Sequence, residues 1–456
     1  MFACAAIQKL TLLALCTSLV AGGFAQSTYA AVESPARLEH PEAALSNSTA
    51  AKVGLDGALD EAYRANPILR ATVAQRAVAE AGVVQAKIRV NPTYQTELAP
   101  AELTYRFFVM TTTTQLGLKR QRRVEVAQRL IDSTNATIRT MAWKIRQDTE
   151  SAYFELAVAR QTLAVMQDYV EITKRLLSIT QKRQAARDAS GLEVLRAEAA
   201  VADAEAQLAP VQVRVEQAQR QLNLVLGRAP ENPIDIAPPE FLLLGKTSAR
   251  LPAFETLISE AEVSRPEFRQ NAADLAVQLA KIKQARSFWW PDVQTSMGMS
   301  SVPQTTAQDA HNWFGSHVLN KPVWLVTMPI TVNDHGQGIL ATARASFRQL
   351  QEQRLALVNQ VRQEVNLAFS SASASERQMD ILFNQSLPRQ AKIVRMSETG
   401  YRSGVLDLTA AITAQQVALA ARLSFLQTAT NYFQALVQLE RAVGRPIITE
   451  IMQGGT

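Results

Sequence analysis

The chain has 456 residues, of which 47% are hydrophobic and 19% are charged, and its formal net charge is +6 at pH 7. This charge is mild for the length, and no stretch concentrates Lys and Arg into the basic strip of a nucleic-acid binder. The composition therefore excludes a strongly basic nucleic-acid-binding protein. The basic cluster at residues 119–123 is expected to be the solvated start of a helix rather than a phosphate site.

The first 30 residues have the pattern of an export signal. Lys9 precedes an apolar run that ends at Phe24, and small residues follow at Ala25 and Ala30. A charged start, an apolar run and a small-residue cleavage site predict a signal peptide at residues 1–30. A flexible arm at residues 31–52 is expected to follow it.

Both cysteines lie inside this predicted signal peptide. Acylation of Cys16 is the weaker alternative, because Leu15 precedes it where a lipoprotein signal has a small residue. The mature chain is therefore expected to have neither a disulfide nor a thiolate site. No later segment has the ~18 apolar residues of a transmembrane helix.

The sequence contains two copies of one outline. Pro67 and Pro92 return as Pro266 and Pro291, each 199 residues later, and Gly227-Arg228 near the end of the first copy returns as Gly444-Arg445. An internal duplication explains why these signals keep the same order. We expect a first repeat at residues 53–230, a linker at 231–252, a second repeat at 253–447 and a tail at 448–456.

Each repeat is expected to hold a short helix, two strands and a very long helical hairpin. Residues 119–184 contain no Pro or Gly, so a helix there would be about 100 Å long at 1.5 Å per residue. Apolar residues recur every seventh position in it and in the return helices, which predicts coiled-coil packing. They are Ile131, Ile138, Ile145, Ala152, Ala159 and Met166, then Val194, Val201, Leu208, Val215 and Leu222, and in the second copy Ile412, Leu419, Leu426 and Phe433.

Four short segments alternate polar and apolar residues, at about 94–98, 105–109, 293–300 and 323–327. Such alternation over ~10 residues is what a strand of an outer-membrane barrel requires. Closed membrane barrels have at least about eight strands, so one chain with four strands must share a barrel with other copies. The predicted fold is mainly α with a small β part.

Several motifs carry a family resemblance. Residues 55–59 (LDGAL) with Ala65-Asn66-Pro67 resemble the opening of the TolC-like outer-membrane efflux family, and residues 385–391, 400–404 and 414–416 resemble its ending. Residues 117–122 (GLKRQR) are similar to a motif of the heavy-metal and cation efflux branch. The resemblance extends over roughly residues 53–447.

This resemblance implies an architecture and partners. Three chains would each give four strands to a 12-stranded outer-membrane β-barrel, and their duplicated long helical hairpins would form a 12-helix tunnel (an α-barrel) in the periplasm. The implied partners of this homotrimer are a periplasmic adaptor (membrane-fusion) protein, a proton-driven inner-membrane pump of the RND type, and outer-membrane lipid.

The implied function is passive. The chain is expected to be the exit duct of a tripartite efflux system that conducts metal cations or small toxic compounds. Two alternatives remain open: the outer-membrane channel of a type I protein-secretion system, and a periplasmic coiled-coil scaffold or adaptor.

In that family the hairpin tips form the gate, which maps to about residues 183–195 and 400–412. Some relatives close this end with an acidic ring, but its two positions are Ala410 and Thr413 here. The charged residues available instead are Arg187, Glu193, Arg402 and Asp407. For Glu193 and Asp407 there is an alternative to a role in the gate. Each could be a solvated carboxylate at the start of a helix, where the helix dipole favours negative charge. Removing both Asp407 and Arg402 is expected to raise channel conductance and to change stability little.

Two prolines lie inside the predicted long helices. Pro210 and Pro388 each remove a backbone donor and are expected to kink their helices. A kinked hairpin that can swing suits a gate, although a kink in each repeat does not by itself identify the gating hairpin.

Chemistry-bearing motifs are absent from the sequence. His311 and His317 with Asp309 could suggest a metal site, but loop histidines of this spacing are more often simply exposed. No phosphate loop, nucleophile elbow or paired His-Glu motif occurs. The sequence therefore predicts no catalytic residue, no cofactor and no metal site, and a protein that is not an enzyme.

Overall fold

A computed structural model describes residues 52–99, 104–237, 251–303 and 318–449. The predicted signal peptide with both cysteines, and the loop histidines His311 and His317, lie outside the described residues. Residues Lys52–Thr456 form one structural unit, and the description below concerns this unit alone.

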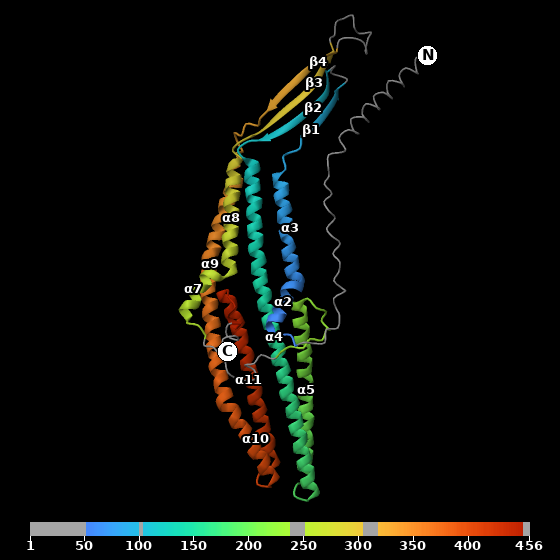
Figure 1. Ribbon diagram of the computed structural model, residues 1–456, viewed down its shortest axis with the longest axis vertical. Coiled ribbons are helices and arrows are strands. Elements are labelled where there is room, and N and C mark those ends of the chain that lie inside the picture. The colour runs from blue at the N-terminus through green and yellow to red at the C-terminus, as the bar shows by residue number, and fades with distance from the viewer. Residues whose placement is uncertain (1–51, 100–103, 238–250, 304–317, 450–456) are drawn as a thin grey trace, which may run out of the picture. The chain divides into compact units, whose positions relative to one another are not determined.

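Helices and strands follow the same order twice (Figure 1). The first series is α2 (Leu55–Ala65), α3 (Pro67–Lys87), β1 (Thr93–Ala99), β2 (Thr104–Gln115), α4 (Lys119–Ala185) and α5 (Gly191–Leu226). The second is α7 (Phe254–Ser264), α8 (Pro266–Ser287), β3 (Asp292–Pro303), β4 (Val318–Thr327), α9 (Gln337–Ile381), a π-helix (Leu382–Ser386), α10 (Leu387–Arg402) and α11 (Leu408–Val443). The predicted long helix is confirmed, because α4 has 67 residues.

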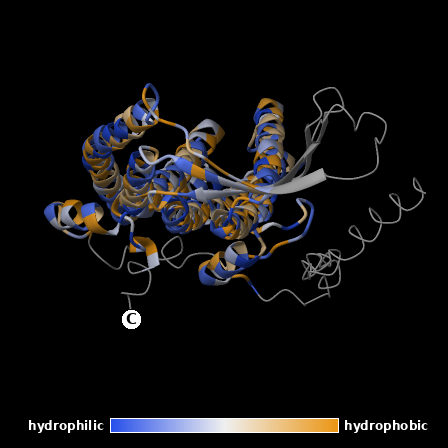
Figure 2. Ribbon diagram, turned by 90° about the horizontal axis from the view of Figure 1, so that it is seen from above, coloured by the Kyte–Doolittle hydropathy of each residue, from blue (hydrophilic) through white to orange (hydrophobic). Residues whose placement is uncertain are grey.

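The long helices pack along the predicted heptad positions. Ile145, Ala152, Ala159 and Met166 of α4 are all at most 4% exposed. Along α4 lie α3, α5, α8 and α11, and seen from above the helices carry both hydrophobic and hydrophilic residues (Figure 2). Within the described residues, no helix combines the length and the hydropathy needed to cross a membrane.

The strands form one antiparallel sheet with the order β1-β2-β3-β4. Neighbours in this order are also neighbours in sequence, so β1 and β4 form its two edges. Irregularities interrupt the register between Gln95 and Glu97 and between Arg106 and Phe108. The sheet and the turns of the two hairpins lie at opposite ends of this unit (Figure 1).

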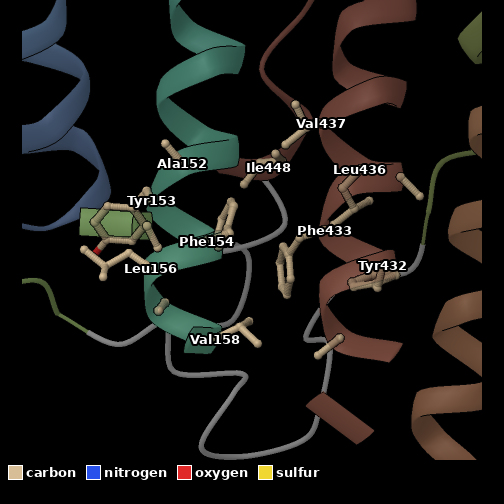
Figure 3. Packing of buried hydrophobic residues seen from close by; sticks show 14 of the residues in the cluster. Ala152, Tyr153, Phe154, Leu156, Val158, Tyr432, Phe433, Leu436, Val437 and Ile448 are labelled. Carbon is tan, nitrogen blue, oxygen red and sulfur yellow. The ribbon is translucent and has the colours of Figure 1, made fainter. Parts of the chain in front are cut away.

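The two hairpins meet through aromatic side chains of α4 and α11 (Figure 3). The rings of Phe154 and Phe433 stack with centroids 4.3 Å apart. The Tyr153 ring meets Phe154 edge-on with centroids 6.0 Å apart, and the Tyr432 ring meets Phe433 edge-on with centroids 5.5 Å apart. Aromatic pairs of this kind contribute about 0.5–1.5 kcal/mol beyond the area that they bury, so this cluster holds the two hairpins together.

A glycine ends each return helix against the short turn that precedes α3 or α8. Gly227 ends α5 with φ +74, and a Cβ there would lie 2.6 Å from the carbonyl oxygen of Ala65. Gly444 ends α11 with φ +82, and a Cβ there would lie 2.6 Å from the Cα of Arg265. Both positions therefore need glycine for conformation and for space.

We expect Gly444→Ala and Gly227→Ala each to lower the free energy of unfolding by about 2–5 kcal/mol. The left-handed conformation costs a residue with a side chain about 1–2 kcal/mol, and overlap with a neighbouring backbone adds about 1–3 kcal/mol. Chemical denaturation in detergent, followed by far-UV circular dichroism, measures this. Gly82→Ala in α3 is the matched control, because no atom lies within 4 Å of its added Cβ, and we expect it to stabilise by about 0.5–1 kcal/mol. Equal effects at all three glycines would contradict the argument.

A buried ion cluster joins α4 to α11. The Arg146 Nε donates to Glu440 Oε1 at 2.7 Å and lies 2.9 Å from Glu150 Oε1. The other oxygen of Glu440 accepts the backbone N–H groups of Ile447 and Ile448, each at 3.0 Å. Both glutamates are 0% exposed, so two carboxyl groups share a single arginine away from water.

One of these two carboxyl groups is neutral at physiological pH. Burial, and then the charge of Glu440, raises the pKa of Glu150 from 4.5 to about 9, although Arg146 acts in the opposite direction. The cluster then contains one carboxylate and one guanidinium, which is the charge balance that a buried site requires.

Candidate functional site

One face of the sheet carries a row of large apolar side chains. Cross-strand partners share a face, and the register aligns Tyr94 with Met110, Met110 with Met297, and Met297 with Trp324. These four side chains, one from each strand, are 40–69% exposed. We call them the apolar row. Large apolar side chains exposed in line across a sheet indicate a face that contacts something other than water.

The opposite face is mostly polar on β1, β2 and β3, with Val109 as an apolar exception on β2. Its rows are Thr93, Thr111 and Ser296, then Thr113 and Gln294, and the hydroxyl groups of Thr111 and Ser296 are 2.8 Å apart. On the edge strand β4, Val323 and Leu325 are exposed on this side as well. An apolar row on one face and mostly polar rows on the other give part of the alternation that is typical of membrane barrel strands.

At the other end of the unit, the α4–α5 and α10–α11 turns form two hairpin tips. Ser190 begins α5 with a capping box completed by Glu193, and Asp407 begins α11 by accepting the N–H of Ala410 at 3.1 Å. Ser190 and Asp407 hold equivalent N-cap positions in the two repeats. Their side chains accept hydrogen bonds from backbone N–H groups of the first helical turn, which have no partner within the helix. This fixes where each return helix begins.

Tyr401 joins the two tips. It is 0% exposed, and its hydroxyl group lies 2.9 Å from Thr180 Oγ1 and 3.3 Å from Glu193 Oε2. The Arg183 guanidinium lies over its ring, 4.6 Å from the centroid, and donates to the Tyr401 carbonyl oxygen at 3.0 Å. A second bond from Arg183 reaches the carbonyl oxygen of Asp188. We call Tyr401, Thr180, Glu193 and Arg183 the tip lock.

A small apolar cluster supports the tip lock. It contains Leu176, Ala197, Leu408 and Ala411 together with the Tyr401 ring. These residues come from both hairpins, so the contact is a packed junction and not a single exposed ion pair. A buried hydroxyl hydrogen bond in such a setting contributes about 0.5–1.5 kcal/mol.

The four charged residues predicted at the tips all lie there, but in separate contacts. Arg187 occupies the α4–α5 turn with φ 66, and Glu193 belongs to the tip lock. Arg402 pairs with Glu398 on its own helix at 3.2 Å, with 59% of its side chain exposed, and Asp407 is the N-cap of α11. Within one chain, Arg402 and Asp407 therefore do not pair with each other.

The two predicted kinks differ in their surroundings. A π-helix, Leu382–Ser386, directly precedes Pro388 and separates α9 from α10. Helix α5 remains helical through Pro210, which borders a cavity of ≈ 360 Å³ between the hairpins. A π-turn is the wider form of helix and often marks functional positions, so Pro388 is the better candidate for a hinge.

Helix α10 is loosely held below this hinge. Its one buried residue is Tyr401. A groove of ≈ 280 Å³ separates it from α4 and α11, where Tyr169, Val394 and Leu419 contribute to the lining. A second groove of ≈ 470 Å³ lies between α10 and α11 beside Asp407. Helix α10 therefore lies between the π-helix and the tip lock with few buried side chains of its own.

The predicted tip ranges include Arg183 and Tyr401, but neither residue is among the predicted gate residues, and Thr180 lies just outside these ranges. Tyr401 stands in the motif of residues 400–404, but nothing local shows that its side chain is buried. In the described residues, no group of three or more His, Cys, Asp or Glu side chains is placed to hold a metal ion.

Comparisons with known proteins agree with this architecture. Residues 257–445 match the family model described as Outer membrane efflux protein. The chain is 24% identical over 396 residues to the cobalt-zinc-cadmium resistance protein CzcC of Cupriavidus metallidurans. The matched region covers 86% of this chain and 90% of that protein.

Two solved structures share the fold. The outer-membrane channel OprN superposes with a TM-score of 0.67 at 19% identity, covering 86% of this chain and 90% of that one. CusC, which was studied for the conformational changes that accompany folding and transmembrane channel formation, superposes with a TM-score of 0.68 at 15% identity. The match covers 88% of this chain and 96% of that one. The chain therefore has the predicted TolC-like fold, and its residues 257–445 are similar to the outer membrane efflux protein family.

Proposed function

We propose that three copies of this chain form the outer-membrane exit duct of a tripartite efflux system. The observation that supports this most directly is the sheet: it has the apolar row on one face, polar side chains on the other, and two free edges. An isolated membrane sheet with free edges leaves backbone groups unpaired in lipid, which costs several kcal/mol per group. Closure with other copies removes these edges.

The strand count favours three copies. Joining β4 of one copy to β1 of the next continues the antiparallel order, because neighbouring strands alternate in direction. Two copies would give a barrel of about eight strands, and side chains fill the interior of a barrel of that size. Three copies give twelve, which leaves an open lumen lined by the threonine and glutamine side chains of the polar face.

The helices also offer a surface to a neighbouring copy. Helix α3 buries Leu69 and Val83 against its own chain, whereas Ile68, Val78 and Val84 are 60–73% exposed. On α9, in the second half of the chain, Ile339 and Leu355 are 52% and 62% exposed. Two different apolar surfaces on one chain suit a head-to-tail ring.

The sheet faces give a direct test. We expect Met297→Lys to prevent stable insertion into the outer membrane, because a lysine on a lipid-facing position at mid-depth costs about 2–4 kcal/mol per chain. Gln294→Lys is the matched control on the opposite face, and it should insert normally while lowering cation conductance. Membrane fractionation, high-salt washing and native mass in detergent are the measurements, and the parent chain and the Gln294 variant should give three chains. A folded, inserted monomer, or equal behaviour of the two variants, would contradict the proposal.

The duct conducts what a pump delivers, without chemistry of its own. Partner proteins are a periplasmic adaptor and a proton-driven pump of the RND type. For the cargo, the similarity to the cobalt-zinc-cadmium resistance protein and the GLKRQR motif both favour divalent metal cations. A type I protein-secretion channel would have the same barrel and tunnel, and it differs in its pump.

Deletion of the gene distinguishes metal efflux from protein secretion. We expect a deletion strain to become several-fold more sensitive to cobalt, zinc or cadmium in growth assays, and to regain resistance with the parent gene. Unchanged metal sensitivity together with loss of a secreted protein from the medium would indicate the type I alternative instead.

A further inference from the structure

The sheet and the helices meet at four junctions, and each of them exposes large apolar side chains. The junctions are α3–β1, β2–α4, α8–β3 and β4–α9, and they lie together beside the sheet (Figure 1). The exposed side chains are Val90, Leu118, Trp289, Trp290, Ile330 and Val332, which are 47–83% exposed. We call them the junction collar.

Two of the collar aromatics are fixed in place. The Trp290 ring lies against Gly117, where an added Cβ would come within 2.5 Å of it. The Trp289 ring meets His335 edge-on at 5.2 Å. Tryptophan concentrates where membrane meets water, because its ring is apolar and its N–H is polar.

Unpaired positive charge lies beside the collar. Lys87 and Arg89 are exposed at the end of α3, and Arg120 is exposed at the start of α4. The Arg120 Nη1 donates to the Lys87 carbonyl oxygen at 3.3 Å, which places the Arg120 guanidinium beside the end of α3. None of the three forms an ion pair with an acid in the described part of the chain.

Two nearby acids already pair with basic side chains, and Asp334 in the β4–α9 junction accepts the backbone N–H of Gly336 at 2.9 Å. Asp292 pairs with Lys119 at 2.8 Å, and Glu125 pairs with Arg122 and Lys283. Helix α4 has no acid in its first turn, although basic residues at a helix N-terminus are unfavourable to its dipole. An anion from outside the chain would offset this unfavourable arrangement.

We propose that the junction collar and this basic corner bind the headgroups of anionic phospholipids in the periplasm-facing leaflet of the outer membrane. This inference rests on the proposed function, since it places the apolar row in the bilayer. The collar continues that row: Tyr94 follows the α3–β1 junction, and Trp324 precedes the β4–α9 junction. Apolar and aromatic side chains reach the acyl chains there, while Lys87, Arg89 and Arg120 meet the phosphates.

A lipid surface explains the distribution better than a protein or free phosphate does. The apolar side chains are spread over four separate junctions, next to strands that face lipid, and form no single pocket. Each basic residue near a membrane strengthens the binding of anionic lipid about fivefold at moderate salt, and the contribution decreases as salt is added.

The test uses the full trimer in liposomes of phosphatidylcholine with a small fraction of brominated phosphatidylglycerol. Bromine quenches nearby tryptophans, so enrichment of the anionic lipid at the collar appears as stronger quenching than brominated phosphatidylcholine gives at the same fraction. We expect an apparent preference of at least about fivefold. Lys87→Gln/Arg89→Gln/Arg120→Gln should bring it close to one. Trp289→Phe/Trp290→Phe should remove the part of the quenching that comes from the collar, while Trp324 in the apolar row stays quenched.

Lys182→Gln/Arg196→Gln/Arg214→Gln is the matched control, because it removes the same charge from exposed positions on the hairpin far from the sheet. It should leave the preference unchanged, and added inorganic phosphate should not displace the lipid. Equal quenching by both lipids in the parent, or an unchanged preference in the triple variant of the basic corner, would overturn the proposal. Failure of the parent chain to enter liposomes would instead count against the proposed function.

Discussion

Replacing Glu440 with alanine should lower the free energy of unfolding by about 3–5 kcal/mol, because it leaves a buried charge without its partner. The variant loses the acceptor of Arg146 and of the N–H groups of Ile447 and Ile448. Each unsatisfied buried group costs about 1–3 kcal/mol. Chemical denaturation in detergent measures the loss. Glu155→Gln, at an exposed glutamate of α4, is the control and should change stability little.

Glu150→Gln should behave in the opposite way and should depend on pH. The native chain holds the proton on Glu150 up to about pH 9, whereas the unfolded chain releases it above about pH 4.5. Protonated Glu150 therefore contributes its full stability to the parent below about pH 4.5. Between about pH 4.5 and pH 9 this contribution decreases, by up to about 1.4 kcal/mol per pH unit. Glutamine needs no proton, so the variant should gain stability over the parent as pH rises from about 5 to about 8. A pH-independent difference would mean that Glu150 is ionised in the native chain.

Opening of the tip lock should produce the largest functional effect. We expect Tyr401→Phe combined with Arg183→Gln to increase the open fraction of the channel about a hundredfold. Each copy loses a hydrogen bond and a cation–π contact worth about 1 kcal/mol together at the low end of their ranges. In the proposed trimer, three copies raise this to about 3 kcal/mol, and each 1.4 kcal/mol is a factor of ten. Single-channel recording in planar bilayers and sensitivity of cells to large antibiotics measure the result.

The double variant Arg402→Ala/Asp407→Ala is the comparison at the same tips. The sequence predicts a higher conductance for it, and the structure limits the size of that effect. Among the described residues, Arg402 pairs with Glu398 on its own helix, and Asp407 caps α11. Exposed pairs of this kind contribute about 0–1 kcal/mol. Its increase should therefore be smaller than that of the tip-lock variant. A larger increase would place the gate in contacts between copies that involve Arg402 or Asp407. Loss of folding in the tip-lock variant would show that Tyr401 is needed for structure first.

Much of the architecture could be predicted from local patterns. The heptad spacing from Ile131 to Met166 requires a long helix with one apolar seam, and α4 has this form because periodicity acts on neighbouring turns. The four alternating segments are strands for a similarly local reason, since side chains alternate between the two faces of a sheet. With four strands in one chain, the sequence also predicts a barrel shared with other copies.

The tip lock and the ion cluster were decided by tertiary structure alone. Tyr401 meets Thr180 across 221 positions of sequence, and neither residue differs in local pattern from an ordinary exposed helix residue. Glu150 looks like any surface glutamate, yet packing of α11 against α4 removes it from water and places Glu440 beside it, which raises its pKa. Periodicity is a property of one helix and can be counted along the chain. Burial and electrostatic coupling depend on which helices come together, and that is fixed only when the whole chain has packed.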